Sequence, residues 1–163
     1  MIATAGPRLF LAALHSGVTA FVARLKHQRV PIDDLGYLRA ARAVGELSKL
    51  APDWNSHRAD RISDQSRAWA TELLIALDKL NRALGCRIPA PAVTPTPDGG
   101  VQLAWSVPSP EGELEVEAIL LEKGGELYVG LAEEAGFQQQ ARIDDIETVA
   151  QQIGRTLKPH FVG

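Results

Sequence analysis

The tightest constraint on the fold is the alternation of apolar and polar residues in the middle of the chain, between residues 89 and 107. A proline-rich arm leads to a turn at Pro97-Asp98-Gly99-Gly100, and the arm that follows has apolar side chains at Val101, Leu103, Trp105 and Val107. Period-two alternation indicates a strand, and an Asp-Gly turn between two such arms is typical of a hairpin. We therefore expect a β-hairpin that begins a sheet, against which the helical parts of the chain must pack.

The alternation continues toward the C-terminus. The segment 113–121 places Leu114, Val116, Ala118 and Leu120 on one face and Glu113, Glu115, Glu117 and Ile119 on the other. A turn at Lys123-Gly124-Gly125 leads to a strand with Leu127, Val129 and Leu131 on one face and Tyr128 on the opposite face, and a short last strand is expected over residues 137–141. Alternation with one charged face predicts an antiparallel sheet with one side in contact with solvent.

Four segments have apolar residues at helical spacing. They run from Pro7 to about Arg29, from a cap at Asp33 or Asp34 to about Leu50, from a cap at Ser63 to Leu84 with Gly85 after it, and from a cap at Asp144 through residues 146–157. In the last one Glu147 stands three residues after Asp144, as in a capping box. The short link at residues 30–32 makes the first two helices antiparallel neighbours.

These elements predict an α+β fold: an N-terminal αα-hairpin, a helix, an antiparallel meander of four or five strands and a C-terminal helix, in a two-layer sandwich. Residues 51–57 interrupt the helical pattern at Pro52. We therefore expect a helical hairpin over residues 1–50 and an α+β sandwich domain over residues 51–163. Either the two helices of the hairpin cover each other, or the hairpin is an oligomerisation arm, because its apolar surface is large for two helices alone.

Length and composition limit the class of protein. The chain has 163 residues, of which 45% are hydrophobic and 23% are charged, as in globular proteins. Its one cysteine, Cys86, excludes a disulfide framework within the chain, and its place after a helix C-terminus disfavours a reactive thiolate. Residues 9–23 are apolar but are interrupted by polar side chains and are shorter than the roughly 20 residues of a membrane span. The expected location is therefore cytoplasmic, without a membrane partner, and the alternative is that residues 1–23 act as a signal segment.

The charge is divided unevenly along the chain. Residues 1–90 hold 13 Lys and Arg against 8 Asp and Glu, whereas residues 91–163 hold 4 against 12. Nucleic-acid affinity comes largely from cations that contact phosphates. An acidic sheet therefore argues against nucleic-acid binding through the sheet domain, and it favours a basic protein partner.

Motifs for cofactor or metal chemistry are not recognisable. The four histidines (His15, His27, His57 and His160) show no pair at metal-ligand spacing. Both Gly-Gly pairs lie between expected strands, where a phosphate-binding loop would need a strand followed by a helix. The sequence therefore predicts no catalytic residue, no cofactor and no metal.

The segment 53–60 is the densest in residues that catalysis uses. Ser56, His57 and Asp60 are the types of a nucleophile, a base and an orienting group, and with Trp54 and Asn55 they mark an alternative site. Three such residues within five positions do not easily face one point. The structural interpretation is that Trp54 anchors the loop onto the core while Asn55 and Ser56 satisfy backbone groups of the turn.

The expected charged face of the sheet is the second candidate. Glu113, Glu115 and Glu117 share one face of a strand, and Glu126 and Tyr128 lie on the neighbouring strand. This group is either a solvated sheet face or a docking surface for a basic partner, since complementary charge accelerates encounter and fixes register.

Two segments together resemble a group of short uncharacterised bacterial proteins. They are Pro52-Asp53-Trp54-Asn55 before a helix, and residues 91–105, PAVTPTPDGGVQLAW, with a proline-rich strand, an Asp-Gly turn and a Trp-containing strand. The resemblance spans residues 52–158, and it departs from the group at His57-Arg58, where the group has Tyr-Gly, and at Ala104, where the group has Glu. It implies the architecture and a packing role for Trp54 and Trp105, but no activity.

The functional expectation is a non-enzymatic protein-interaction module, an antitoxin- or immunity-like binder of a basic partner. One alternative is a small hydrolase or transferase with its site near residues 54–60. The other is an oligomeric scaffold, a homo-oligomer assembled through residues 7–50.

Overall fold

The computed structural model describes residues 34–85, 87–131 and 139–161. The helix expected over residues 7–29 and Cys86 lie outside these ranges. In chain order the elements are α2 (Asp34–Glu46), the 3-10 helix η1 (Leu47–Lys49), α3 (Asp64–Leu84), β1 (Ala92–Pro95), β2 (Val101–Ser109), β3 (Gly112–Leu121), β4 (Gly124–Leu131), β5 (Gln139–Ile143), α4 (Ile146–Leu157) and the 3-10 helix η2 (Lys158–His160). Helices and an antiparallel sheet confirm the predicted α+β class.

The five strands form one sheet in the order β1-β2-β3-β4-β5, so every strand pairs with its neighbours in sequence, and all pairs are antiparallel. The predicted hairpin is present, with β1 and β2 on either side of the turn at residues 97–100. Two strand boundaries differ from the prediction. The strand expected over residues 137–141 is β5, at 139–143, and β4 begins at Gly124, so the glycine pair belongs to the strand.

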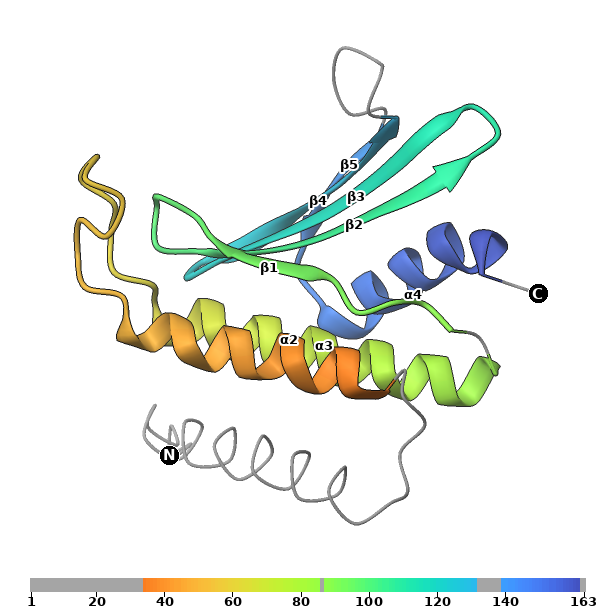
Figure 1. Ribbon diagram of the computed structural model, residues 1–163, viewed down its shortest axis with the longest axis horizontal. Coiled ribbons are helices and arrows are strands. Elements are labelled where there is room, and N and C mark those ends of the chain that lie inside the picture. The colour runs from red at the N-terminus through yellow and green to blue at the C-terminus, as the bar shows by residue number, and fades with distance from the viewer. Residues whose placement is uncertain (1–33, 86, 132–138, 162–163) are drawn as a thin grey trace, which may run out of the picture.

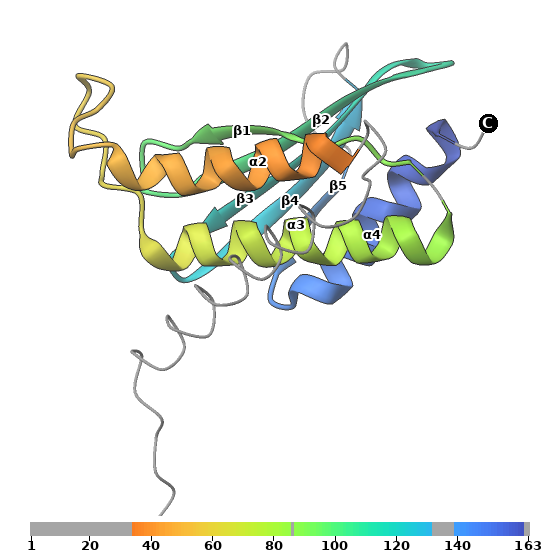
Figure 2. The same cartoon turned by 60° about the horizontal axis from the view of Figure 1, so that its bottom comes forward.

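The helices α2, α3 and α4 lie on one face of the sheet (Figures 1 and 2). The core fills the space between them and that face. Its largest fully buried members from the sheet are Val101, Leu103, Leu120, Leu127 and Ile143, and those from the helices include Val44, Leu73, Leu74, Leu77, Ile153 and Leu157. Tyr37, Ala40, Ala41 and Val44 of α2 belong to the same cluster, so residues 34–46 share the core of the sheet.

Helix ends were predicted with mixed success. Ser63 caps α3 by accepting from the backbone N–H of Ser66, and Gly85 follows with a left-handed φ of 61°, both as expected. The predicted cap of α4 was wrong, because Asp145 and not Asp144 accepts from the N–H of Thr148, at 2.8 Å. Helix α2 ends at Glu46 and continues only as a 3-10 turn, which is short of Leu50.

Partly buried hydrogen bonds join the two layers at the C-terminal end of α3. The amide of Asn81 is paired with both backbone groups of Ile88, at 2.9 and 3.1 Å, and the indole N–H of Trp105 donates to the carbonyl of Pro89 at 2.9 Å. The hydroxyl of Tyr37 contacts that same carbonyl at 3.4 Å. The segment 88–89 is therefore held by α2, α3 and β2 together.

None of the described helices is long and apolar enough to cross a membrane.

The hairpin turn is closely packed, which leads to a stability prediction. A Cβ on Gly100 would lie 2.6 Å from Cδ2 of Leu121 and 2.8 Å from the carbonyl oxygen of Leu120. We expect Gly100→Ala to lower the free energy of unfolding by about 2 kcal/mol, because overpacking displaces well-packed neighbours. Gly45→Ala, where a Cβ meets nothing within 4 Å, is the control and should raise stability by up to about 1 kcal/mol through helix propensity. Urea unfolding of both variants measures the difference, and equal effects would contradict the predicted clash.

Candidate functional site

The face of the sheet opposite the helices, which we call the outer face, carries the predicted acidic residues. No described helix covers it (Figure 1). Along β3 the buried residues Val116, Ala118 and Leu120 alternate with more accessible neighbours, so Glu115 and Glu117 point to the outer face, where they are half-buried, and Glu113 is exposed. The alternation in the sequence therefore predicted correctly which residues of β3 are buried and which are accessible.

The strand register brings the acidic residues of β3 and β4 together. Glu117 lies opposite Tyr128, and Ile119 lies opposite Glu126. Residues that are directly opposite in an antiparallel pair share a face, with Cβ atoms roughly 5 Å apart. The five predicted residues, Glu113, Glu115, Glu117, Glu126 and Tyr128, are therefore on one surface, with Ile119 among them.

Glu117 is in an unfavourable environment for a charged carboxylate. Partial burial and, to a smaller extent, the neighbouring carboxylate of Glu115 raise the pKa of Glu117, while a hydrogen bond from Gln102 opposes the change. Gln102 belongs to β2, and Thr94 of β1 contacts its side chain at 3.3 Å. Polar contacts therefore extend from β1 across β2 to the carboxylate on β3.

Tyr128 is bonded to a carboxylate of its own strand. Its hydroxyl donates a hydrogen bond to Oε2 of Glu126. This bond, which ionisation would break, is the main reason that the pKa of Tyr128 is raised. The pair fixes a hydroxyl and a carboxylate beside Ile119. An aromatic ring and an apolar side chain next to carboxylates are suited to binding cationic side chains.

The loop 53–60 is held by local hydrogen bonds to its own backbone. Oδ1 of Asp53 accepts from the N–H of Arg58 at 2.6 Å, and Oδ1 of Asn55 accepts from the N–H of His57 at 2.9 Å. Asp53, Ser56 and Arg58 have positive φ angles of 62°, 59° and 61°, a region that costs energy for side chains other than glycine. The side chains of Asp53 and Asn55 thus satisfy backbone N–H groups of the turn. Ser56 takes part through its backbone N–H, which donates to the carbonyl of Asp53 at 2.9 Å.

The structure does not assemble a catalytic group from this loop. Ser56, His57 and Asp60 are all exposed, and among the described residues His57 makes no side-chain hydrogen bond to either of the others. The backbone N–H of Asp60 donates to the carbonyl of Pro97 at 2.7 Å, which fixes the loop to the hairpin turn. Trp54 is half-buried outside the main hydrophobic cluster, and its indole N–H is buried without a partner. The loop is therefore anchored by backbone hydrogen bonds and not by packing of Trp54 onto the core.

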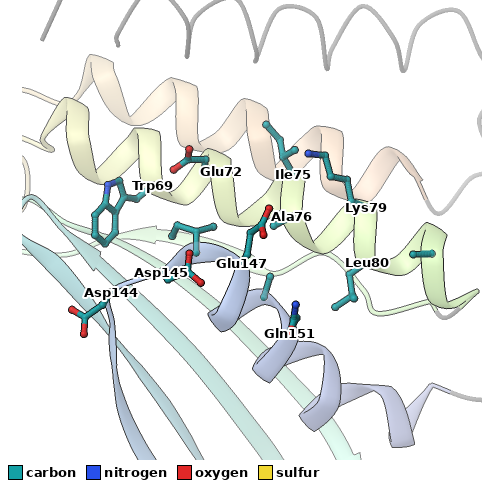
Figure 3. A pocket seen from close by; sticks show the side chains of 13 residues that line it. Trp69, Glu72, Ile75, Ala76, Lys79, Leu80, Asp144, Asp145, Glu147 and Gln151 are labelled. Carbon is teal, nitrogen blue, oxygen red and sulfur yellow. The ribbon is translucent and has the colours of Figure 1, made fainter. Parts of the chain in front are cut away.

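A groove between α3 and α4 was not predicted from the sequence. It has a volume of about 620 Å³ and is lined by residues of α3, of the start of α4 and of the turn before α4 (Figure 3). Trp69 and Leu80, which lie on the apolar stripe of α3, line this groove and are only half-buried. A periodic stripe does not distinguish a residue under a sheet from one beside a neighbouring helix.

Comparisons of the chain with protein-family models, with curated proteins and with solved structures gave no match. Within the ranges that the structure describes, no group of three or more His, Cys, Asp or Glu residues is placed to hold a metal ion. The functional argument therefore depends on the geometry of the outer face.

The Glu126–Tyr128 hydrogen bond can be tested by titration. We expect Glu126→Gln to lower the pKa of Tyr128, because the strongest stabilisation of the protonated phenol is removed. Ultraviolet absorbance measures the ionisation, and Tyr128→Phe identifies which of the two tyrosines is responsible. An unchanged titration in Glu126→Gln, with the fold intact by circular dichroism, would contradict the bond.

The raised pKa of Glu117 predicts how stability varies with pH. A carboxyl whose pKa is higher in the folded than in the unfolded chain opposes folding when it is ionised, so its effect is present at neutral pH and disappears as the pH falls through the folded pKa. We expect Glu117→Gln to raise the free energy of unfolding at pH 7.5, by less than about 1 kcal/mol because solvent screens the site. The gain should vanish at acidic pH. Glu113→Gln, an exposed position on the same strand, is the control, and a pH-independent difference for Glu117→Gln would contradict the assignment.

Proposed function

We propose that the protein is a non-enzymatic interaction module that binds a basic protein partner through the outer face of its sheet. The observation that carries the proposal is the register of β3 and β4, which gathers four glutamates and Tyr128 on a face that no described helix covers. An antitoxin- or immunity-like role, in which a small acidic domain captures a basic protein, is the biological class that we propose.

The electrostatics of the outer face support a binding role over a merely solvated surface. A surface that serves only solubility mixes charges of both signs. On one side of β3, Glu113, Glu115 and Glu117 follow one another, and the pKa of Glu117 is raised partly by Glu115. Arg142 of β5 lies opposite Glu126 on the same face and pairs with Asp144, so the row of a single sign is confined to β3. Like charges placed so closely reduce stability, and a cationic partner would relieve that repulsion.

The spacing of the carboxylates specifies the partner. Alternate residues of a strand are about 6.8 Å apart, so the three glutamates of β3 form a row about 14 Å long. Tyr128 and Ile119 lie beside this row and supply apolar contact area. A partner surface with several Lys or Arg side chains around a small apolar centre would match both features.

Charge neutralisation tests the proposal. The full chain, tagged, is used to capture partners from cells of its source, and the triple variant Glu113→Gln, Glu115→Gln, Glu117→Gln is compared with wild type by quantitative mass spectrometry. We expect the variant to capture at least about tenfold less of a basic partner than wild type does, since each close charge pair at an interface contributes roughly 1 kcal/mol or more. Capture should also weaken as salt is raised from low to moderate concentration.

A second triple variant, Glu46→Gln, Glu111→Gln, Glu122→Gln, is the matched control. It makes the same change in net charge at exposed positions that lie at the end of α2 and in the turns of the sheet, away from the outer face. It should retain capture. Equal capture by wild type and both variants would refute binding through the outer face, and equal loss in both would show a dependence on net charge alone.

A further inference from the structure

The groove between α3 and α4 has an apolar floor that small side chains leave open. The two helices pack closely at Gly154, where a Cβ would lie 2.3 Å from Cδ2 of Leu80. Between that contact and Trp69 the groove is lined by Ala76 of α3 and Ala150 of α4, whose short side chains fill little of the space. The apolar lining includes Trp69, Ile75, Ala76, Leu80, Ile146 and Ala150.

Two carboxylates from different helices lie beside this floor. Glu72 follows Trp69 by three positions and precedes Ala76 by four, so these three side chains share one face of α3. Glu147 lies in the first turn of α4 and lines the same part of the groove (Figure 3). Among the residues that the structure describes, no ion pair or side-chain hydrogen bond involves either carboxylate. Both are therefore available to a ligand.

The other two acidic residues of the groove have structural roles. Asp144 pairs with Arg142 at 3.0 Å, and Asp145 caps α4 by accepting from the backbone N–H of Thr148 at 2.8 Å. Their charges make the potential at this end of the groove more negative, but their oxygens already have partners. A cation that entered the groove would therefore pair with the two available carboxylates.

The groove differs in charge between its two ends. Lys79 is the one cation among the lining residues that the structure describes, and it lies beside Leu80, away from the acidic residues (Figure 3). It follows Glu72 by seven positions, which is a rise of about 10 Å along α3. The groove therefore attracts a positive group at one end and repels it at the other.

We propose that this groove binds a small-molecule amine whose ammonium group is carried on an apolar body. The ammonium lies between Glu72 and Glu147 beside the ring of Trp69, because carboxylates and an aromatic face both attract a cation. The apolar body lies along Ala76 toward the contact between the helices. The proposal is independent of the outer face, which is on the other side of the sheet.

The volume of the groove favours a small molecule over a docked helix. The volume is about 620 Å³, and small-molecule sites have roughly 300–1,000 Å³. A helix that followed α3 from Trp69 to Ala83 would be about 21 Å long and about 11 Å across, with a volume of about 2,000 Å³. Most of such a helix would lie outside the groove. An amine with an aryl or branched alkyl group fits within it.

The charge at the Leu80 end favours a monoamine over a diamine. A second ammonium group at the end of an extended chain would approach Lys79, and like charges at close range repel. An apolar end would instead contact Leu80, which is half-buried. The ligand class is therefore an amine with one positive end and one apolar end.

NMR titration of the 15N-labelled full chain tests the proposal. The probe is phenylbutylamine, and the controls are phenylbutyrate, which has the opposite charge, and diaminohexane, which has no apolar end. We expect phenylbutylamine to shift the indole N–H signal of Trp69, assigned with Trp69→Phe, and the amide signals of Ala76 and Ala150, all saturably. Both controls should bind at least about tenfold more weakly.

Two results of this titration would overturn the proposal. Equal binding of phenylbutylamine and phenylbutyrate would show that apolar contact alone is responsible. Shifts centred on Glu117 and Tyr128, or no saturable shift, would show that the groove is not the amine site.

Two double variants with the same change in net charge test the role of the carboxylates. Glu72→Gln with Glu147→Gln should raise the Kd of phenylbutylamine at least about tenfold, because both charge pairs are lost. Glu111→Gln with Glu122→Gln, at exposed positions in turns of the sheet, should leave that Kd unchanged. An unchanged Kd in the groove variant, or an equal rise in both variants, would overturn the proposal.

Discussion

The inner face of the meander must be buried, and the rest of the structure depends on that constraint. Val101, Leu103, Val116, Ala118 and Leu120 are completely buried between the sheet and the helices. Because side chains alternate along a strand, a slip of one residue in β2 would turn Val101 and Leu103 to the other face, and a slip in β3 would do the same to Val116, Ala118 and Leu120. The same alternation that buries Val116 sends Glu115 and Glu117 to the opposite side. The position of the acidic residues on the outer face is therefore a geometric consequence of burying the core.

The two faces of the sheet differ in chemistry because the helices that the structure describes pack on only one of them. The outer face combines half-buried glutamates with Tyr128 and Ile119 on paired strands, which gives a rigid display. On the helical side, Gly154 brings α4 against Leu80 while the start of α4 leaves a groove beside Trp69. The linker 88–89 and the contact of Asp60 with Pro97 hold the helices and the loop to the sheet at opposite ends of α3. The described helices thus stabilise the sheet from one side, and the glutamates of β3 lie on the other.

The sequence predicted most accurately those elements whose local signals agree with their burial. Helix α3 has a cap at Ser63, a stripe and a terminal glycine at Gly85, and its bounds were correct. The cap of α4 was assigned one residue early, because Asp144 and Asp145 are equally good caps by type. In the structure Asp144 pairs with Arg142 at 3.0 Å, and Asp145 caps the helix. The positive φ angles at Asp53, Ser56 and Arg58 left no sequence signal, since glycine is absent there. The groove was missed because Trp69 and Leu80 have the same spacing as core residues.

By itself, the sequence determined the α+β class, the faces of β2 and β3 and the acidic character of the sheet, because these follow from periodicity and composition, which are local properties. Only the tertiary structure decided that Glu117 lies opposite Tyr128, that Ser56, His57 and Asp60 do not converge, and that carboxylates from α3 and from the start of α4 share one groove. Each of these depends on which strands and helices become neighbours. Neighbours are chosen by the free energy of burying the whole core, and no single segment contains that information.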